Sequence, residues 1–207
     1  MLVLSTSYNF TMINPELPSF GNCSYTNVNE LNTYSNENKL SLLNINMRSL
    51  KNKFTILLAF INIIKTPIDL IVVTETWLDD ANATLFPIPG YKIICINRST
   101  TGGGVCLYYR EHVDVTIIEE FSGIFNTHES LTVNINIKDK MSTAICIYCI
   151  YRPPQNDVNM FMNYLQYLKE KSCFKKCILI GDFNINILDN NNRFANLFAQ
   201  SLYEMNS

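Results

Sequence analysis

The sequence predicts an α+β fold in which packed β-sheets are covered by helices. The chain has 207 residues, of which 47% are hydrophobic and only 16% charged, so it is long and apolar enough to bury one sizeable core. Eight short segments are rich in β-branched and aromatic residues, and three others show helical spacing. Their order is neither a regular βαβ repeat nor all-β, which favours sheets with helices packed against them.

The first 38 residues differ in composition from the rest. Eight asparagines fall between Asn22 and Asn46, counting both, among Ser, Thr and Pro, and periodic apolar spacing is scarce. Such a segment buries too little apolar surface to offset the entropy of ordering it. We therefore expect residues 1–38 to be a disordered tail and residues 39–207 to form the domain.

The expected strands follow one another from Leu40 onward. Each is a run of about six to nine residues dominated by Val, Ile, Leu, Tyr and Cys, and polar or turn-forming residues flank it. These segments are 40–45, 69–75, 91–97, 104–110, 113–118, 130–137, 143–151 and 177–182.

Three helices are expected between and after these strands. Five apolar residues recur at helical spacing between residues 53 and 65, and Pro67 ends that pattern. Phe161, Leu165 and Leu168 mark a second helix. Apolar residues between positions 194 and 202 mark a third.

Composition excludes several classes of protein. The formal net charge of -2 rules out a strongly basic nucleic-acid scaffold, although a local basic patch is still compatible with it. No apolar run approaches the roughly 20 residues needed to span a bilayer, so we expect no membrane partner. The N-terminus lacks the basic region of a secretory signal, which predicts an intracellular, reducing environment.

The seven cysteines are expected to have no disulfide partner, because they are odd in number and scattered. Cys146 and Cys149 form a C-x-x-C inside a predicted strand, where residues three apart point to opposite faces and cannot bind one metal. Cys173 and Cys177 have no second ligand pair at zinc-finger spacing. We interpret both pairs as thiols that pack in or near the core.

Polar residues follow or end several predicted core strands. Asn46, Glu75, Asp182 and Asn184 occupy such positions, and they would converge if their strands are neighbours. Carboxylate and amide oxygens suit a hard cation such as Mg²⁺, which needs only one or two carboxylates. Taken singly, each residue is more often a strand-end cap or turn residue, so the prediction depends on all four together.

Five motifs occur in an order that carries more information than any one of them: NMRSL (46–50), TETWL (74–78), TGGGVCLYYR (101–110), IYRPP (150–154) and GDFN (181–184). In this order and spacing they resemble the endonuclease/exonuclease/phosphatase superfamily. They are most similar to the apurinic-endonuclease-like domain of non-LTR (LINE-type) retrotransposons. The resemblance covers about residues 40–200 and implies two packed mixed sheets flanked by helices, a four-layer α/β/β/α sandwich.

The resemblance also implies chemistry: hydrolysis of a phosphodiester in double-stranded target DNA with Mg²⁺ or Mn²⁺ as cofactor. It assigns Glu75 as the principal metal ligand and Asn46 as a residue near the metal. It assigns Tyr151 to a hydrogen bond with the scissile phosphate, Asp182 to the attacking water and Asn184 to a phosphate oxygen. A nuclear location is implied by the family's chromosomal target alone, and the oligomeric state is left open.

The chain departs from the family pattern near its end. The pattern continues beyond GDFN to a Ser-Asp-His motif, whereas this sequence ends about 25 residues after Asp182. Its histidines, His112 and His128, lie upstream and are expected in loops or on the surface. We therefore expect a fold that is incomplete at the C-terminus and an activity impaired by truncation.

Two alternatives to a retrotransposon endonuclease stay open. One is a catalytically dead remnant, or a module that binds nucleic acid without cutting it. The other is a phosphatase of the same superfamily acting on phospholipid or inositol phosphate head groups.

The glycines 102–104 are expected to form a turn before a strand. Four basic residues have two possible roles: their charges are either solvated at the surface or in contact with a nucleic-acid backbone. They are Arg48, Lys51, Lys53 and Arg152. Trp77 is expected to pack its own loop, with stacking on a base as the alternative.

Overall fold

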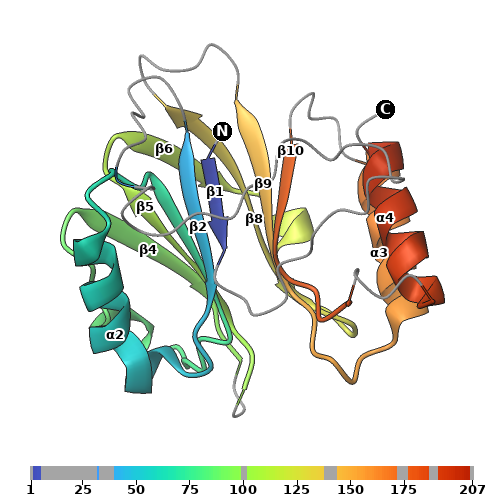
Figure 1. The fold of residues 1–207 in the computed structure, drawn as a ribbon, viewed down its shortest axis with the longest axis horizontal. Coiled ribbons are helices and arrows are strands. Elements are labelled where there is room, and N and C mark those ends of the chain that lie inside the picture. The colour runs from blue at the N-terminus through green and yellow to red at the C-terminus, as the bar shows by residue number, and fades with distance from the viewer. Residues whose placement is uncertain are drawn as a thin grey trace.

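The computed structural model describes residues 2–5, 32, 40–98, 102–137, 144–171, 177–186 and 191–205. Two mixed sheets lie face to face, with helices on both outer faces (Figure 1). This is the four-layer α/β/β/α sandwich that the sequence predicted.

The first sheet has five strands. In spatial order they are β1 (Leu2–Ser5), β2 (Ser41–Asn46), β3 (Leu70–Thr74), β5 (Val105–Arg110) and β4 (Tyr91–Ile96). β1, β2 and β3 run parallel, and β5 is antiparallel to both β3 and β4. β1 lies within the segment predicted to be a tail; most of that segment is outside the described residues, so the domain boundary stays a prediction.

The second sheet contains β10 (Cys177–Asp182), β9 (Ile145–Tyr151), β8 (Glu129–Ile137) and β6 (Val113–Ile117) in that order, and β7 (Gly123–Ile124) also pairs with β8. β10 and β9 are parallel, and the other pairs are antiparallel. All eight predicted strands are therefore present. The short strands β1 and β7 were not predicted.

The helices cover the outer faces as their apolar spacing requires. α2 (Leu50–Ile63) packs on the first sheet, whereas α3 (Val158–Lys171) and α4 (Arg193–Met205) pack on the second (Figure 1). Two single turns of 3₁₀-helix, η1 (Ala83–Leu85) and η2 (Glu119–Phe121), complete the described elements. None of the described helices is long and apolar enough to cross a membrane.

Alternation along the strands separates the core into three layers. Leu70 and Val72 of β3 point to the other sheet, while Ile71 and Val73 point to α2. β3 is buried on both faces, which explains its uninterrupted apolar sequence. Burial at about 25 cal/mol per Å² makes these layers the main stabilising contribution.

The cysteines give one confirmed prediction and one correction. Cys146 and Cys149 lie in different core layers, on opposite faces of β9, and neither is disulfide-bonded. Cys95 and Cys106, however, form a disulfide, so the prediction that the cysteines have no disulfide partner is wrong. These two residues face each other directly on adjacent antiparallel strands, with Cα atoms 4.2 Å apart, a juxtaposition that spacing along the chain does not reveal.

Candidate active site

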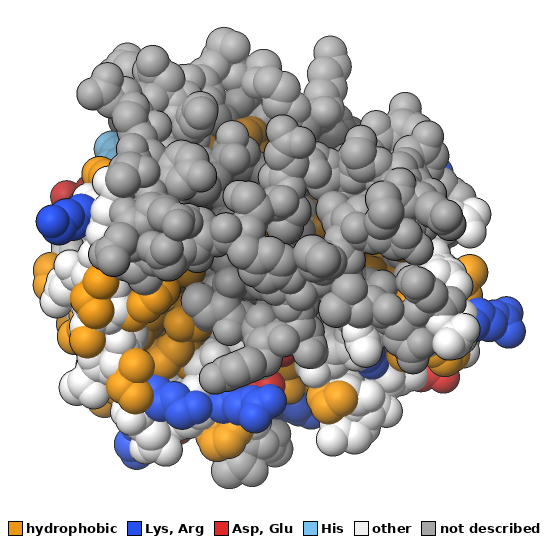
Figure 2. All heavy atoms as spheres, viewed as in Figure 1, with side chains coloured by type: hydrophobic (Ala, Val, Ile, Leu, Met, Phe, Trp, Pro, Cys, Tyr) orange, Lys and Arg blue, Asp and Glu red, His pale blue; other side chains and the backbone are white. Residues whose placement is uncertain are grey.

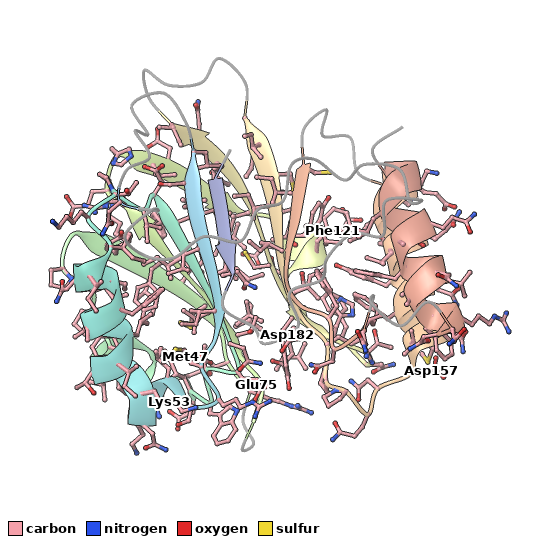
Figure 3. All side chains as sticks on the ribbon, in the orientation of Figure 1. Met47, Lys53, Glu75, Phe121, Asp157 and Asp182 are labelled. Carbon is pink, nitrogen blue, oxygen red and sulfur yellow. A yellow bond between two sulfur atoms is a disulfide. The ribbon has the colours of Figure 1, made fainter. Side chains whose placement is uncertain are left out.

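Four predicted site residues lie at the same end of both sheets. Asn46, Tyr151 and Asp182 are the last residues of β2, β9 and β10, and Glu75 directly follows β3. β2 and β3 are parallel, as are β9 and β10, so the carboxyl ends within each pair meet at one edge. Figure 3 shows Glu75 and Asp182 facing one another at the lower end of the two sheets.

Asn46 joins the two carboxylates. Its Nδ2 donates to Glu75 Oε1 at 2.8 Å and to Asp182 Oδ2 at 2.6 Å, so these oxygens lie within about 5.4 Å of each other. Its Oδ1 accepts the backbone N–H of Arg48 at 3.1 Å, which fixes the amide's orientation. Two carboxylates and an amide thus share one small volume.

The backbone at Glu75 adopts a left-handed conformation, with φ of 52°. Such a conformation costs a non-glycine residue about 1–3 kcal/mol and persists only when its surroundings enforce it. Here the Glu75 carbonyl accepts the N–H of Ser49 at 2.8 Å, and the neighbouring Thr76 carbonyl accepts the N–H of Leu50 at 2.8 Å. The start of α2 therefore holds the loop that presents Glu75.

The glycine turn supports the same loop from the other side. Gly102, Gly103 and Gly104 have φ between 75° and 98° just before β5, so the predicted turn is confirmed. The Gly103 carbonyl accepts the Trp77 N–H at 2.9 Å. A Cβ on Gly104 would collide with Thr76 Oγ1, so only glycine permits this close approach.

Glu129 anchors the turn and was missed by sequence reasoning. Its carboxylate accepts the Gly104 N–H, and Arg98 lies 3.3 Å away from it. Burial raises the pKa of Glu129, an effect that the Gly104 hydrogen bond and Arg98 oppose and nearby Glu75 reinforces. The sequence does contain one indication that Glu129 has a specific role: it is a single acidic residue at the start of an apolar strand, ESLTVNINI.

Tyr151 lies beside this cluster with only 6% of its surface exposed. Burial raises the pKa of its phenol, and the carboxylates of Glu75, Asp182 and Glu129 raise it further. The phenol therefore stays protonated at neutral pH and can serve as a hydrogen-bond donor.

Asn184 is close to the cluster but faces a different partner. Its backbone N–H donates to Asp182 Oδ1 at 3.1 Å, while its side-chain Nδ2 donates to the carbonyl of Arg152 at 2.8 Å. Its φ of 49° is again left-handed. Asn184 thus orients Asp182 through the backbone, and its amide is not part of the hydrogen bonds centred on Asn46.

Arg152 is buried, with 1% exposure, which excludes the nucleic-acid contact considered from the sequence. Its guanidinium donates to four carbonyl oxygens, those of Pro153, Asn156, Phe183 and Asn184, at 2.7 to 3.1 Å. Burial lowers its pKa, and Asp182 opposes that shift. Arg152 therefore acts as a clamp on the segment that carries Asp182 and Asn184.

Neither histidine contributes to the cluster. His112 is exposed, as expected, and its Nε2 lies 3.1 Å from Asp69 Oδ1. His128 lies in the loop before β8, as expected, but it is not on the surface: it is 1% exposed and stacks on Phe125. Burial lowers the pKa of His128 to about 3, which keeps the imidazole neutral.

The oxygen ligands of this cluster suit a divalent cation that keeps most of its waters, and they are too few to surround a metal ion with protein ligands alone. Within the described parts of the chain, no group of three or more His, Cys, Asp or Glu residues could hold a metal. Mg²⁺ keeps several waters and needs only one or two carboxylates plus substrate phosphate. Glu75 and Asp182, bridged by Asn46, offer that number.

A four-layer sandwich with a carboxylate and amide cluster at its strand ends defines a class of phosphoester-cleaving proteins. The model of the Endonuclease/Exonuclease/phosphatase family matches residues 41–199, and the chain belongs to this family. The family is generally dependent on divalent metals. No curated protein sequence matches the chain.

Solved structures share the fold at low identity. The endonuclease domain of TRAS1, a telomere-specific non-LTR retrotransposon, has a TM-score of 0.57 at 13% identity, covering 80% of this chain and 70% of that one. A variant of the 3′ phosphatase NExo from Neisseria, bound to product DNA hairpin, gives 0.57 at 14%, covering 80% and 71%. An AP endonuclease from Archaeoglobus fulgidus gives 0.54 at 17%, covering 80% and 70%.

Proposed function

We propose that this chain is a metal-dependent phosphodiester hydrolase that nicks double-stranded DNA, of the kind found as the endonuclease domain of non-LTR retrotransposons. The observation that carries the proposal is the Asn46 amide shared by the carboxylates of Glu75 and Asp182 beside the Tyr151 phenol. Family membership supports phosphoester chemistry. A nuclear location belongs to the proposal, because chromosomal DNA would be the target.

The proposed roles follow from the hydrogen bonds. Glu75 would be the ligand of Mg²⁺ or Mn²⁺, and an ion held there would polarise a phosphoryl oxygen and offset charge on the leaving oxygen. Asn46 would act near the metal by orienting the Glu75 carboxylate through its Nδ2; turning its amide over would be needed for its Oδ1 to bind the ion directly.

Asp182, oriented by the Asn46 amide and the Asn184 N–H, accepts a proton from the attacking water. The protonated Tyr151 would donate to a non-bridging phosphate oxygen. Asn184 Nδ2 gives one hydrogen to the Arg152 carbonyl, and its second amide hydrogen would be the donor to the phosphate.

A plasmid-nicking assay tests this proposal. We expect conversion of supercoiled to open-circular DNA in Mg²⁺ or Mn²⁺ and none in EDTA. Asp182→Asn removes the proton acceptor, so the rate should fall by about 10²–10⁴-fold. Asp114→Asn, an exposed aspartate on β6, is the matched control and should nick like the wild type. Equal rates for the two variants would refute the assigned role of Asp182.

We also expect the rate to be low. The chain has two histidines; one faces Asp69 and the other is buried beside Phe125, so neither helps to transfer protons at Asp182. A version extended through a Ser-Asp-His segment should nick faster by about 10²-fold or more. Equal rates would show that such a histidine is dispensable.

The same protein preparations separate the alternatives. Release of phosphate from inositol phosphates, abolished by Asp182→Asn, without DNA nicking would favour the phosphatase. Binding of DNA with no cleavage in any metal would favour a catalytically dead remnant.

A further inference from the structure

Trp77 is an exposed aromatic side chain beside the candidate active site. It is the only tryptophan of the chain, and 43% of its surface is exposed, although its neighbours Thr76 and Leu78 are 0% and 1% exposed. The loop therefore buries the residues on either side and leaves the largest apolar ring outside. This arrangement corrects the expectation that Trp77 packs its own loop.

The backbone holds Trp77 in place rather than leaving it on a loose tip. Its φ is 56°, a conformation that a bulky residue rarely adopts. The Trp77 N–H donates to the Gly103 carbonyl at 2.9 Å, and the Thr76 carbonyl accepts the Leu50 N–H at 2.8 Å. Strain of this kind persists where surrounding contacts enforce it, and it is concentrated at functional sites.

A basic residue lies in the equivalent position of the neighbouring loop. Arg48 follows Asn46 by two residues, as Trp77 follows Glu75, and Arg48 is also left-handed and exposed. The Ser49 N–H, next to Arg48, donates to the Glu75 carbonyl, so the two loops are joined beside the carboxylate cluster. Trp77 and Arg48 are thus exposed residues of two joined loops that also carry Glu75 and Asn46.

Further positive charges border the same edge. Lys51 is exposed and Lys53 half-buried at the start of α2, and Arg98 lies across the glycine turn. Figure 2 shows Lys and Arg side chains gathered along the lower edge of the molecule, where Figure 3 places Lys53 and Glu75.

The acidic residues of the Trp77 loop already have local partners. Asp79 Oδ1 accepts the Asn82 N–H at 3.0 Å, and Asp80 Oδ1 accepts Asn97 Nδ2 at 2.9 Å. Both carboxylates are exposed, and each is held by a hydrogen bond, Asp79 within the Trp77 loop and Asp80 to Asn97 after β4.

We infer that Trp77 and Arg48 form a nucleotide platform, in which the indole stacks on an unstacked base of the DNA strand and Arg48 binds a phosphate next to the one cleaved. A ligand with anionic groups and flat apolar rings matches both side chains. An acidic peptide would pair with the positive charge of Arg48 but would offer no flat ring to stack on the Trp77 indole. The inference rests on the proposed function and makes the site favour DNA whose bases are locally unpaired.

The sole tryptophan makes a direct test possible. In EDTA, where cleavage is blocked, a single-stranded oligonucleotide should quench Trp77 emission, with the midpoint given by anisotropy of a labelled copy. An oligonucleotide of equal length whose central nucleotides are abasic keeps the phosphates and should bind more weakly without quenching. Polyglutamate should not quench. Binding without quenching, or quenching by polyglutamate, would overturn the platform while leaving the proposed nuclease intact.

Variants provide the second readout. Trp77→Ala should weaken oligonucleotide binding by about 5- to 150-fold, the range measured for loss of one base–aromatic stack. Trp77→Phe should recover most of that loss. Tyr167→Ala, which removes an exposed aromatic of α3, should bind like the wild type. Equal affinities of the Trp77→Ala and Tyr167→Ala variants would refute the platform. Absence of both binding and nicking would refute the proposed function as well.

Discussion

Replacing Arg152 by lysine tests whether the clamp on the active-site segment is structural. The guanidinium makes four hydrogen bonds to carbonyl oxygens, three of them at 2.7 Å. A lysine ammonium has three protons on one nitrogen and cannot reproduce the planar fork. We expect it to satisfy at most two of the four acceptors.

The expected loss follows from the bonds that disappear. A hydrogen bond to a charged group contributes about 1.5–3 kcal/mol, so losing two should lower the free energy of unfolding by roughly 3 kcal/mol or more. Arg152→Met removes all four bonds, but it also removes the cost of burying a charge. We expect a loss of about 3–5 kcal/mol for the methionine variant.

Urea unfolding followed by circular dichroism measures both values. Arg193→Lys serves as the control, because Arg193 is exposed and such changes stay within about 0.5 kcal/mol. The Arg152→Lys variant should also nick more slowly below its unfolding temperature, since Asp182 and Asn184 lose their support. A free energy of unfolding for Arg152→Lys within about 0.5 kcal/mol of the wild type would refute the clamp.

Two further predictions concern the glycine turn and the buried histidine. Gly104→Ala should be less stable than Gly102→Ala by at least about 1 kcal/mol. Both glycines have left-handed φ, but only at Gly104 would the added Cβ collide with Thr76. Equal urea midpoints for the two variants would contradict this. Burial lowers the pKa of His128 to about 3 in the folded protein, whereas its ordinary pKa is 6.5. Between these values the unfolded chain binds a proton that the folded protein does not. The free energy of unfolding should therefore fall by up to roughly 1.4 kcal/mol per pH unit as the pH drops from about 6 toward 3. Thermal unfolding at several pH values should show this slope diminished in His128→Phe, and parallel slopes would show that His128 is not its cause.

The strands and helices could be predicted because their signals are local. Alternating or continuous β-branched runs mark β2 to β6 and β8 to β10, and Pro67 limits α2. β7 has only two residues, too few to form a pattern. The polar strand ends could be predicted for the same reason, because Asn46 and Asp182 end apolar runs. That their side chains lie close together could be expected only from the family resemblance.

What the sequence could not show depends on contacts between distant segments. Two of the four acceptors of Arg152, the carbonyls of Phe183 and Asn184, lie 31 and 32 residues further along the chain, so the sequence around Arg152 does not show that its charge is buried. Cys95 and Cys106 meet only because β4 and β5 pair in one particular register. The burial of His128 follows from stacking on Phe125 and contact with the tilted ring of Tyr164, and α3 supplies Tyr164 from 36 residues further along the chain.

The cluster is assembled from both sheets, so its geometry depends on their spacing as well as on the strands themselves. Asn46 lies in the first sheet and Glu75 directly follows its strand β3, whereas Tyr151 and Asp182 lie in the second sheet. Asn44, two residues before Asn46 on β2, donates from Nδ2 to the Gly181 carbonyl at 3.2 Å and ties the sheets together next to the site. The amide of Asn46 then spans the same gap to Asp182 at 2.6 Å. Two asparagines of one strand, on the same face because they are two residues apart, therefore set the separation of the carboxylates on which the proposed chemistry depends.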